Sequence, residues 1–498
     1  MKDYSHYYPK VDRDIERALL KKLDMRLVAW GTCAYFSNVL LRGNMPYAFT
    51  TGMNTDLHLN SSAYNWAVSM FFISYSLFQM PSNIIFSQVQ PRYYLPTAVI
   101  LSGVLSNLAV FINDKHRGLL YVVRFCMGLS EAGCYPCIIF LISSWYTQKE
   151  LNTRACMIVI GSNLALAANG LIGGTVFTTL DGVANIRGWK WMFMIEGVLA
   201  IIIGITGYFC LPNYPHNTPW ITGVERQVAL QRKPITQNFW KEHESLLFVS
   251  AKTLKHLATT PYIYMLIFMF ACIVMGDSVI HNFAIILNGM GYSSVQSNYY
   301  SASVYIFSIV PTLALAKTSD IMRHKGLHIF LVSLWSALWY SFAWFGSSSL
   351  PIMFAAAFAV TLNAVLIPIT LNWASQIYAC DHEMRACMMA LIVSVGNLIP
   401  YLIKPMTWEV TDAPNFRNGK TTCVLAGLGA AICCVLITWC LKLRFRLPQD
   451  VREEEFMNER QPLLSQVRIH RTHSYYSNDD DEEEEDKVGY RSTLASPP

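Results

Sequence analysis

The sequence predicts an all-α membrane protein with twelve transmembrane helices arranged in two six-helix bundles. Three observations support this prediction: a composition of 53% hydrophobic and 14% charged residues, long apolar runs between Leu27 and Leu441, and similar motifs in the two halves. Soluble domains usually contain about 25% charged residues. A bilayer core about 30 Å thick is crossed by roughly 20 helical residues, which is close to the length of these runs. The sequence therefore excludes a soluble globular fold.

The apolar runs give six expected spans in each half. They are residues 24–43, 64–86, 94–112, 118–142, 155–177, 191–211, 261–287, 297–316, 327–345, 350–378, 386–403 and 422–441. The expected parts are a cytoplasmic tail (1–23), an N-terminal bundle (24–211), a cytoplasmic central loop (212–260), a C-terminal bundle (261–445) and a disordered acidic tail (446–498).

The distribution of Lys and Arg places both termini in the cytoplasm, because basic loops resist translocation. Asn60 begins an Asn-Ser-Ser glycosylation sequon in the first non-cytoplasmic loop, which agrees with this orientation. The sequence shows no metal-ligand cluster, no nucleophile with a positioned base and no phosphate loop, so we expect no cofactor and no enzymatic activity. The net charge of +5 reflects the cytoplasmic basic loops, so we expect no nucleic-acid partner.

The two halves share a short motif. Arg154-Ala-Cys-Met recurs as Arg385-Ala-Cys-Met at an offset of 231 residues, and Arg92 and Arg323 have the same offset. Repeated halves are typical of transporters in which two bundles rock around a site near the middle of the membrane.

Charged residues in the short cytoplasmic loops suggest a gate. Ion pairs that form in one state and break in the other would bias the equilibrium between them. The alternative is ordinary loop charge, worth about 0 to 1 kcal/mol per exposed pair. The gating candidates are Arg92, Glu150, Arg154, Asp320, Arg323, Glu383 and Arg385.

The motif that begins at Arg124 (RFCMGLSEAG), with Pro136 and Ser144-Trp145-Tyr146, resembles the fourth-span signature of the major facilitator superfamily. More narrowly, it resembles the fungal anion:cation symporters, the allantoate permease-like group. Asp181-Gly182 and Asp412-Ala413-Pro414 resemble the vitamin branch, which contains biotin and pantothenate permeases. The resemblance implies the major facilitator fold and proton-coupled symport of a small organic anion, such as a vitamin, a carboxylate or a sulfur compound.

Two arginines inside expected spans are the first candidates for substrate binding. An intramembrane arginine persists mainly where it pairs, lines water or meets a ligand, and its guanidinium matches a carboxylate. Arg42 is the substrate contact implied by the resemblance, although it lies near the span end and could instead reach the interface. Arg124 is the second candidate, and the resemblance adds Tyr75 and Asn163.

Glu131 is the candidate for binding the driving proton. It lies two helical turns after Arg124, so the two residues share a helix face, and a purely structural pair is the alternative. Many relatives have Asp before the first-span arginine, whereas this chain has Leu41, which puts the proton stoichiometry in doubt. Asp277 and His281, four residues apart, could supply a replacement titrating pair.

The C-terminal tail contains an acidic dileucine motif formed by Glu459, Leu463 and Leu464, which a sorting adaptor could bind. The expected location is the plasma membrane, with the vacuolar membrane as the alternative, and we expect a monomer. Two other functions stay open: a non-transporting nutrient receptor on the same fold, and a uniporter or exchanger without proton coupling.

Overall fold

The computed structural model describes residues 13–215, 217–232, 261–322, 325–345, 350–377, 382–409, 412 and 415–446. Within these ranges the chain folds into helices and short connections, with no strand. In hydrocarbon every backbone polar group must be satisfied internally, and an α-helix achieves this within one segment. The predicted all-α membrane fold is confirmed.

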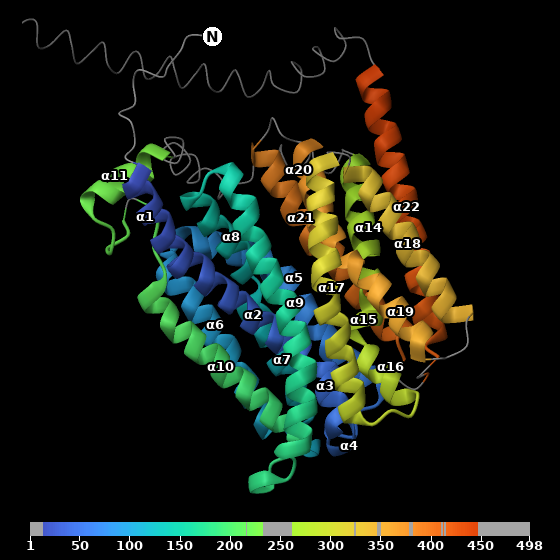
Figure 1. Cartoon of the computed structure of the whole chain (residues 1–498). Helices are drawn as coiled ribbons and strands as arrows, with labels where there is room; N and C mark the ends of the chain where they lie inside the picture. The colour runs from blue at the N-terminus through green and yellow to red at the C-terminus, as the bar shows by residue number, and fades with distance from the viewer. Residues whose placement is uncertain are drawn as a thin grey trace, which may run out of the picture. The chain divides into compact units, whose positions relative to one another are not determined.

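The first half of the chain contains the helices shown in blue to green in Figure 1. Their bounds are α1 (Arg13–Leu23), η2 (Asp24–Val28), α2 (Ala29–Gly43), α3 (Met45–Ala48), η3 (Phe49–Met53), α4 (Asn54–Asp56), α5 (Ser61–Gln88), α6 (Pro91–Leu108), η4 (Ala109–Phe111), η5 (Asp114–His116), α7 (Gly118–Glu131), α8 (Cys134–Trp145), α9 (Gln148–Thr179), η6 (Val183–Asn185), α10 (Gly188–Cys210) and α11 (Gly223–Arg232). We call residues 24–211 the N-terminal half.

The second half contains α14 (Pro261–Gly276), α15 (Ser278–His281), α16 (Phe283–Gly289), α17 (Ser294–Met322), α18 (Lys325–Phe345), α19 (Leu350–Thr361), η7 (Leu362–Val365), α20 (Leu366–Ile377), α21 (His382–Thr407) and α22 (Arg417–Arg446). We call residues 261–435 the C-terminal half; they belong to the same compact unit as the N-terminal half, and the last turns of α22 lie outside it.

Nine helical segments in the described part of the chain are long and apolar enough to cross a membrane. They are 91–111, 118–145, 160–179, 188–210, 262–281, 294–319, 354–375, 388–407 and 417–441. The other three expected spans coincide with η2 and α2, with α5 and with α18. The predicted N-terminal tail contains α1, whose Leu19 and Leu23 are fully buried.

The helices pack first within each half. In the N-terminal half α6 packs on α10, α5 on α7 and α2 on α9, and in the C-terminal half α14 packs on α21. Small residues permit the closest approach: a Cβ added at Gly103 of α6 would lie 2.6 Å from the Gly197 carbonyl oxygen of α10. The most extensive contacts between the halves are those of α9 with α17, which lie side by side in Figure 1, and of α5 with α21; η3 also contacts α16 and α17.

Candidate functional site

Arg124 is fully buried on α7 and supports the end of α2. Its Nη1 and Nη2 donate to the carbonyl oxygens of Leu41 and Arg42, at 3.4 and 3.3 Å. The last carbonyls of a helix have no partner within the helix, so these hydrogen bonds satisfy groups that would otherwise be unpaired. The guanidinium also lies 5.0 Å from the ring centre of Phe71. In this structure Arg124 therefore holds the backbone that presents Arg42.

Arg42 is half-buried at the end of α2. Its Nη2 donates to the Tyr35 hydroxyl at 3.2 Å, and its guanidinium lies 5.5 Å from the Tyr35 ring centre. A guanidinium has five N–H donors. Within the described residues the Arg42 side chain uses one of them, in the hydrogen bond to Tyr35. Tyr75 and Glu131 lie close enough to interact electrostatically with it. Arg42 therefore has donors available for a ligand.

Glu131 is the last residue of α7 and is 1% exposed. Neither carboxyl oxygen has a hydrogen-bond partner among the described residues. The positive charges of Arg42 and Arg124 act on it without forming a direct ion pair. The structural Arg124–Glu131 pair, which was the alternative at the sequence level, is thus not formed here.

Asp277 and His281 lie where the first span of the C-terminal half is broken, between α14 and α16. A carboxyl oxygen of Asp277 accepts from Asn363 Nδ2 at 3.0 Å, and His281 Nδ1 lies 2.8 Å from the Asp277 backbone oxygen. The two residues are therefore close, but their side chains do not bond to each other. Asn363 also donates to the Ile273 carbonyl oxygen of α14 at 2.7 Å.

Lys404 is a charged residue that the sequence-based prediction missed. It lies on α21, is 5% exposed, and its Nζ is 5.6 Å from the ring centre of Tyr401. Its charge interacts with Asp277 and with His281. The expected eleventh span ends at residue 403, whereas α21 continues to Thr407, so the prediction leaves Lys404 outside the span.

These side chains form one group, which we call the charged cluster: Arg42, Arg124, Glu131, Asp277, His281 and Lys404. Its members come from both halves. Arg42 and Lys404 both interact electrostatically with His281. Tyr401 stacks on Phe72 of α5 with ring centres 3.6 Å apart, so the cluster is assembled where α5 meets α21.

Two other expected substrate contacts differ in position. Tyr75 is buried beside Arg42, and its ring stacks on Phe71 with centres 6.1 Å apart. Asn163 is half-buried on α9, and within the described residues it has no hydrogen bond to the charged cluster. Tyr75 therefore belongs with Arg42, whereas the structure gives Asn163 no contact with the cluster.

A hollow of about 470 Å³ lies elsewhere, between α17 and α19. It is lined by Ser303, Val304, Phe307, Phe354, Ala355 and Phe358. It contains no charged side chain, so its chemistry does not suit an anion. We therefore place the candidate site at the charged cluster.

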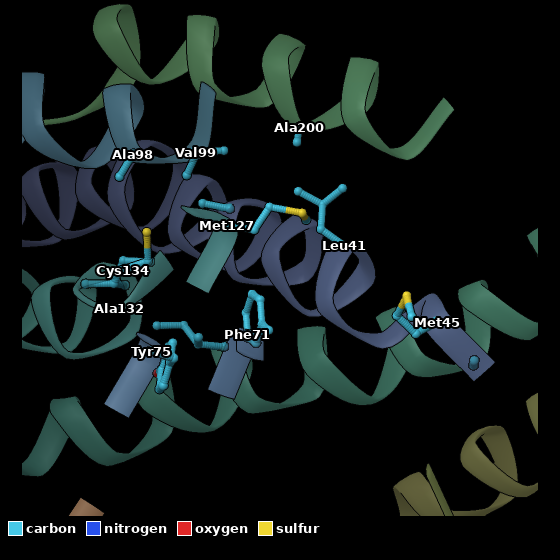
Figure 2. Close-up of a cluster of buried hydrophobic side chains, with 14 of the residues drawn as sticks. Leu41, Met45, Phe71, Tyr75, Ala98, Val99, Met127, Ala132, Cys134 and Ala200 are labelled. Atoms are coloured by element: carbon cyan, nitrogen blue, oxygen red, sulfur yellow. The ribbon is translucent and has the colours of Figure 1, made fainter. Parts of the chain in front are cut away.

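Leu41, at the position where the resemblance of the sequence implies an Asp, is fully buried among apolar side chains. Figure 2 shows it beside Met127 of α7 and Ala200 of α10. Its side chain contributes to the packing of the N-terminal half, and it cannot carry a proton. Its backbone oxygen is one of the two that accept from Arg124.

Three gating candidates bind partners within the N-terminal half or the helices attached to it. Arg154 pairs with Asp24 at 2.7 Å, and Arg92 Nε donates to the Tyr208 carbonyl oxygen at 2.7 Å. Glu150 accepts from Arg232 of α11 at 2.7 Å. In this structure, therefore, Arg154 and Arg92 bind partners inside the N-terminal half and Glu150 fastens α11 to it, and none of these three contacts joins the two halves.

The remaining candidates are less defined. Asp320, Glu383 and Arg385 lie on α17 and α21, but their side chains are outside the described residues, as is the whole of Arg323.

The sorting motif, formed by Glu459, Leu463 and Leu464, also lies outside the described residues. Asn60 is exposed and caps α5, its Oδ1 accepting from the Ala63 N–H at 2.8 Å.

Comparison with known proteins gives one family. The model of the Major Facilitator Superfamily matches residues 31–403. A putative tartrate transporter of Agrobacterium vitis is 26% identical over 416 residues, covering 82% of this chain and 88% of the relative. The MFS-type transporter cnsO of Penicillium expansum is 28% identical over 444 residues, covering 85% and 83%. A bacterial homologue of the human lysosomal transporter Spinster, in an inward-facing and unoccupied conformation, has a similar fold, with a TM-score of 0.62, 14% identity and coverage of 82% and 95%.

Proposed function

Because the chain belongs to the Major Facilitator Superfamily and is a multi-pass membrane transporter, we propose that it carries a small organic anion together with protons. The observation that carries this proposal is the pairing of Arg42, which has unused donors, with Glu131, a buried carboxyl without a direct partner. Both lie in one electrostatic group. Cargo and proton would therefore bind to groups that influence each other.

Arg42 is the proposed contact for the anionic group of the substrate. A guanidinium inside the membrane has a high free-energy cost unless it is paired or hydrated, and its planar fork of donors fits a carboxylate or sulfonate. Arg124 acts through Arg42, because it holds the two carbonyl groups at the end of α2. The printed name of the Agrobacterium relative, a tartrate transporter, also supports an organic anion.

Glu131 is the proposed proton carrier. An ionised carboxylate buried without a hydrogen bond is costly, and proton binding removes that charge. When a substrate anion occupies Arg42, the favourable interaction between Arg42 and Glu131 is weakened, which favours the protonated carboxyl. Uptake of the anion and of the proton would thus be linked.

The test is transport by purified protein in proteoliposomes, with a panel of labelled carboxylates and sulfonates. Glu131→Gln should retain exchange of substrate across the membrane but lose accumulation driven by a pH gradient. Glu196→Gln is a matched control, because Glu196 is fully buried on α10 and already accepts from Asn44 Nδ2 at 2.8 Å. Gradient-driven accumulation by the Glu131→Gln protein would refute the proposed role.

An exchanger without proton coupling is the second candidate function, and Leu41 is the observation in its favour. A carboxyl group that many relatives have is replaced here by a side chain packed in the apolar core. In that case wild-type protein would exchange anions equally well with and without a pH gradient. The same vesicle assay distinguishes the two functions.

The proposed mechanism is alternating access, and this structure supplies one of its states. Apart from the hydrogen bond that Ser394 Oγ of α21 donates to Gln79 Oε1 of α5 at 3.4 Å, several direct contacts between the halves lie near η3 and the start of α17. Thr50 Oγ1 donates to Asn298 Oδ1 at 3.1 Å, and Ser294 Oγ donates to the Thr50 carbonyl oxygen at 2.6 Å. Asn65 of α5 also donates to the Trp408 carbonyl oxygen. These residues lie on the side predicted to be non-cytoplasmic. We propose that this side is closed, as in an inward-facing state.

We also propose that the protein belongs to the allantoate permease-like group, near the vitamin permeases. We propose that it is a monomer and that it lies in the plasma membrane or the vacuolar membrane.

A further inference from the structure

Lys404 is a buried cation that the fold does not neutralise directly. It lies between Pro400 and Pro405 on α21 and is 5% exposed. Its Nζ makes no hydrogen bond and no ion pair within 4 Å to any described residue, and it lies 5.6 Å from the centre of the Tyr401 ring. A charge inside the membrane persists mainly where it pairs, lines water or serves a ligand.

The neighbouring carboxyl does not pair with Lys404. Asp277 interacts with it electrostatically, but its carboxyl accepts a hydrogen bond from Asn363. The Lys404 ammonium has three donors, so a ligand carboxylate could bind it directly.

Arg42 approaches the same place from the other half. Its charge acts on His281 and on Tyr401, and Lys404 interacts with both of these residues as well. Tyr401 is fixed between the halves by its stack on Phe72. One cation with unused donors from each half therefore acts electrostatically on the same side chains, His281 and Tyr401.

We propose that Lys404 is a second anion anchor and that the transported molecule carries two acidic groups, one bound by Arg42 and the other by Lys404. This inference rests on the proposed function and specifies the substrate class of the same site. A single acidic group would leave one buried cation unpaired, whereas a diacid pairs with both.

The arrangement also has a consequence for the conformational change. A diacid bound at both ends would join α2 to α21, which belong to different halves. Its affinity would therefore be greatest in states where the halves hold both cations close together, and binding would shift the population toward those states. A monoacid bound only by Arg42 would give no such shift.

The test compares acids of equal carbon number by competition and by ligand-induced thermal stabilisation of the purified full-length protein. The pairs are malonate and propionate, succinate and butyrate, and glutarate and valerate, with succinamide as the neutral compound. Wild-type protein should bind one of the diacids at least ten-fold more tightly than the monoacid of its pair.

Lys404→Met should lower the affinity for that diacid about ten-fold, to the level of the monoacid, and leave monoacid binding unchanged. Lys404→Arg should retain most of the preference, since the charge remains. Lys420→Met is the matched control: Lys420 is 6% exposed, and its charge interacts with Asp412 rather than with the charged cluster.

The outcomes separate this inference from the proposed function. If no diacid is preferred, or if Lys404→Met weakens both acids of a pair equally, the second anchor is refuted while anion transport stands. If the Lys404→Met protein does not fold, the second anchor is tested by the preference of the wild-type and Lys404→Arg proteins for a diacid over its monoacid. If succinamide binds as well as the acids and Arg42→Gln changes nothing, the proposed function itself is wrong.

Discussion

Arg154 donates to both carboxyl oxygens of Asp24, from Nε at 2.7 Å and from Nη2 at 3.1 Å, and its guanidinium lies 4.0 Å from the ring centre of Tyr146. This bidentate ion pair connects the start of the first span to the start of α9. Asp24 also accepts from the Tyr146 hydroxyl at 2.8 Å, so three helical segments meet at one carboxylate.

Asp24→Asn should lower the free energy of unfolding by about 1 kcal/mol, because a charge-assisted pair is lost at a partly exposed site. The measurement is thermal unfolding in detergent. Asp14→Asn is the control, since Asp14 pairs with Arg17 at 3.8 Å and both side chains are largely exposed. Equal effects of the two substitutions would contradict the importance of the Asp24 pair.

Glu150 gives the attachment of α11 a defined pH dependence. Burial alone would raise the pKa of this carboxyl, but the Thr147 N–H and the Arg232 charge outweigh burial, so the pKa is lowered. A carboxyl with a lowered folded-state pKa stabilises the fold above its unfolded-state pKa, near 4.3, and this stabilisation is lost as the pH falls through the folded-state value. We therefore expect α11 to loosen as the pH falls from the unfolded-state pKa of Glu150 through its lower folded-state pKa.

Hydrogen exchange of α11, corrected for the intrinsic rate at each pH, measures this loosening. Glu150→Gln should weaken protection already at pH 7 and reduce its further loss at low pH. The lowered pKa of Glu225, which pairs with Lys22, accounts for the pH dependence that remains. If the protection of α11 in the Glu150→Gln protein depended on pH in the same way as in the wild type, Glu150 would not contribute to that pH dependence.

The sequence predicts the helical fold well because the bilayer imposes one length and one composition on every span. It also places Arg42, Arg124 and Glu131 in the membrane, since a charged side chain within an apolar run is visible without any structure. The partners of Glu150 and Arg154 were not predictable in this way. Arg232 of α11 and Asp24 of η2 are distant from these two residues in the chain, and only the folded structure brings them close.

Lys404 was missed for a local reason. Pro400 and Pro405 flank it, and prolines commonly end helices in water, whereas α21 continues through both to Thr407. In a membrane, neighbouring helices can satisfy the backbone groups that a proline frees, so proline is a weaker marker of a helix end. Ending the expected span four residues before Thr407 therefore removed a buried charge from the predicted site.

Leu41→Asp should fold, although it places a carboxyl in an apolar core. The Leu41 backbone already contacts the fully buried Arg124, whose Nε has no partner among the described residues, so a carboxylate here gains a nearby guanidinium. Leu40→Asp is the control, because Leu40 is equally buried but packs on Val39 and Ala165. Size-exclusion chromatography should give a monodisperse Leu41→Asp protein and aggregated Leu40→Asp protein; the reverse result would show that Arg124 cannot reach a carboxyl at position 41.

Gly170→Ala should weaken the contact between α9 and α17. A Cβ at this position would lie 2.5 Å from the Asn298 carbonyl oxygen, a backbone atom that cannot rotate away, so the halves must separate there. The contacts of Thr50 with Asn298 and Ser294 would then lengthen or break, and the equilibrium would shift away from the state seen here.

Pulsed electron spin resonance between spin labels at the exposed positions 55 and 296 measures this shift as a longer distance between the two labels. Gly118→Ala is the control, because a Cβ at Gly118 meets nothing within 4 Å. If Gly170→Ala and Gly118→Ala give the same distance distribution as the wild type, the α9–α17 contact does not hold this side closed. If only Gly170→Ala gives the longer distance, close packing at a residue without a side chain is what allows the two halves to meet.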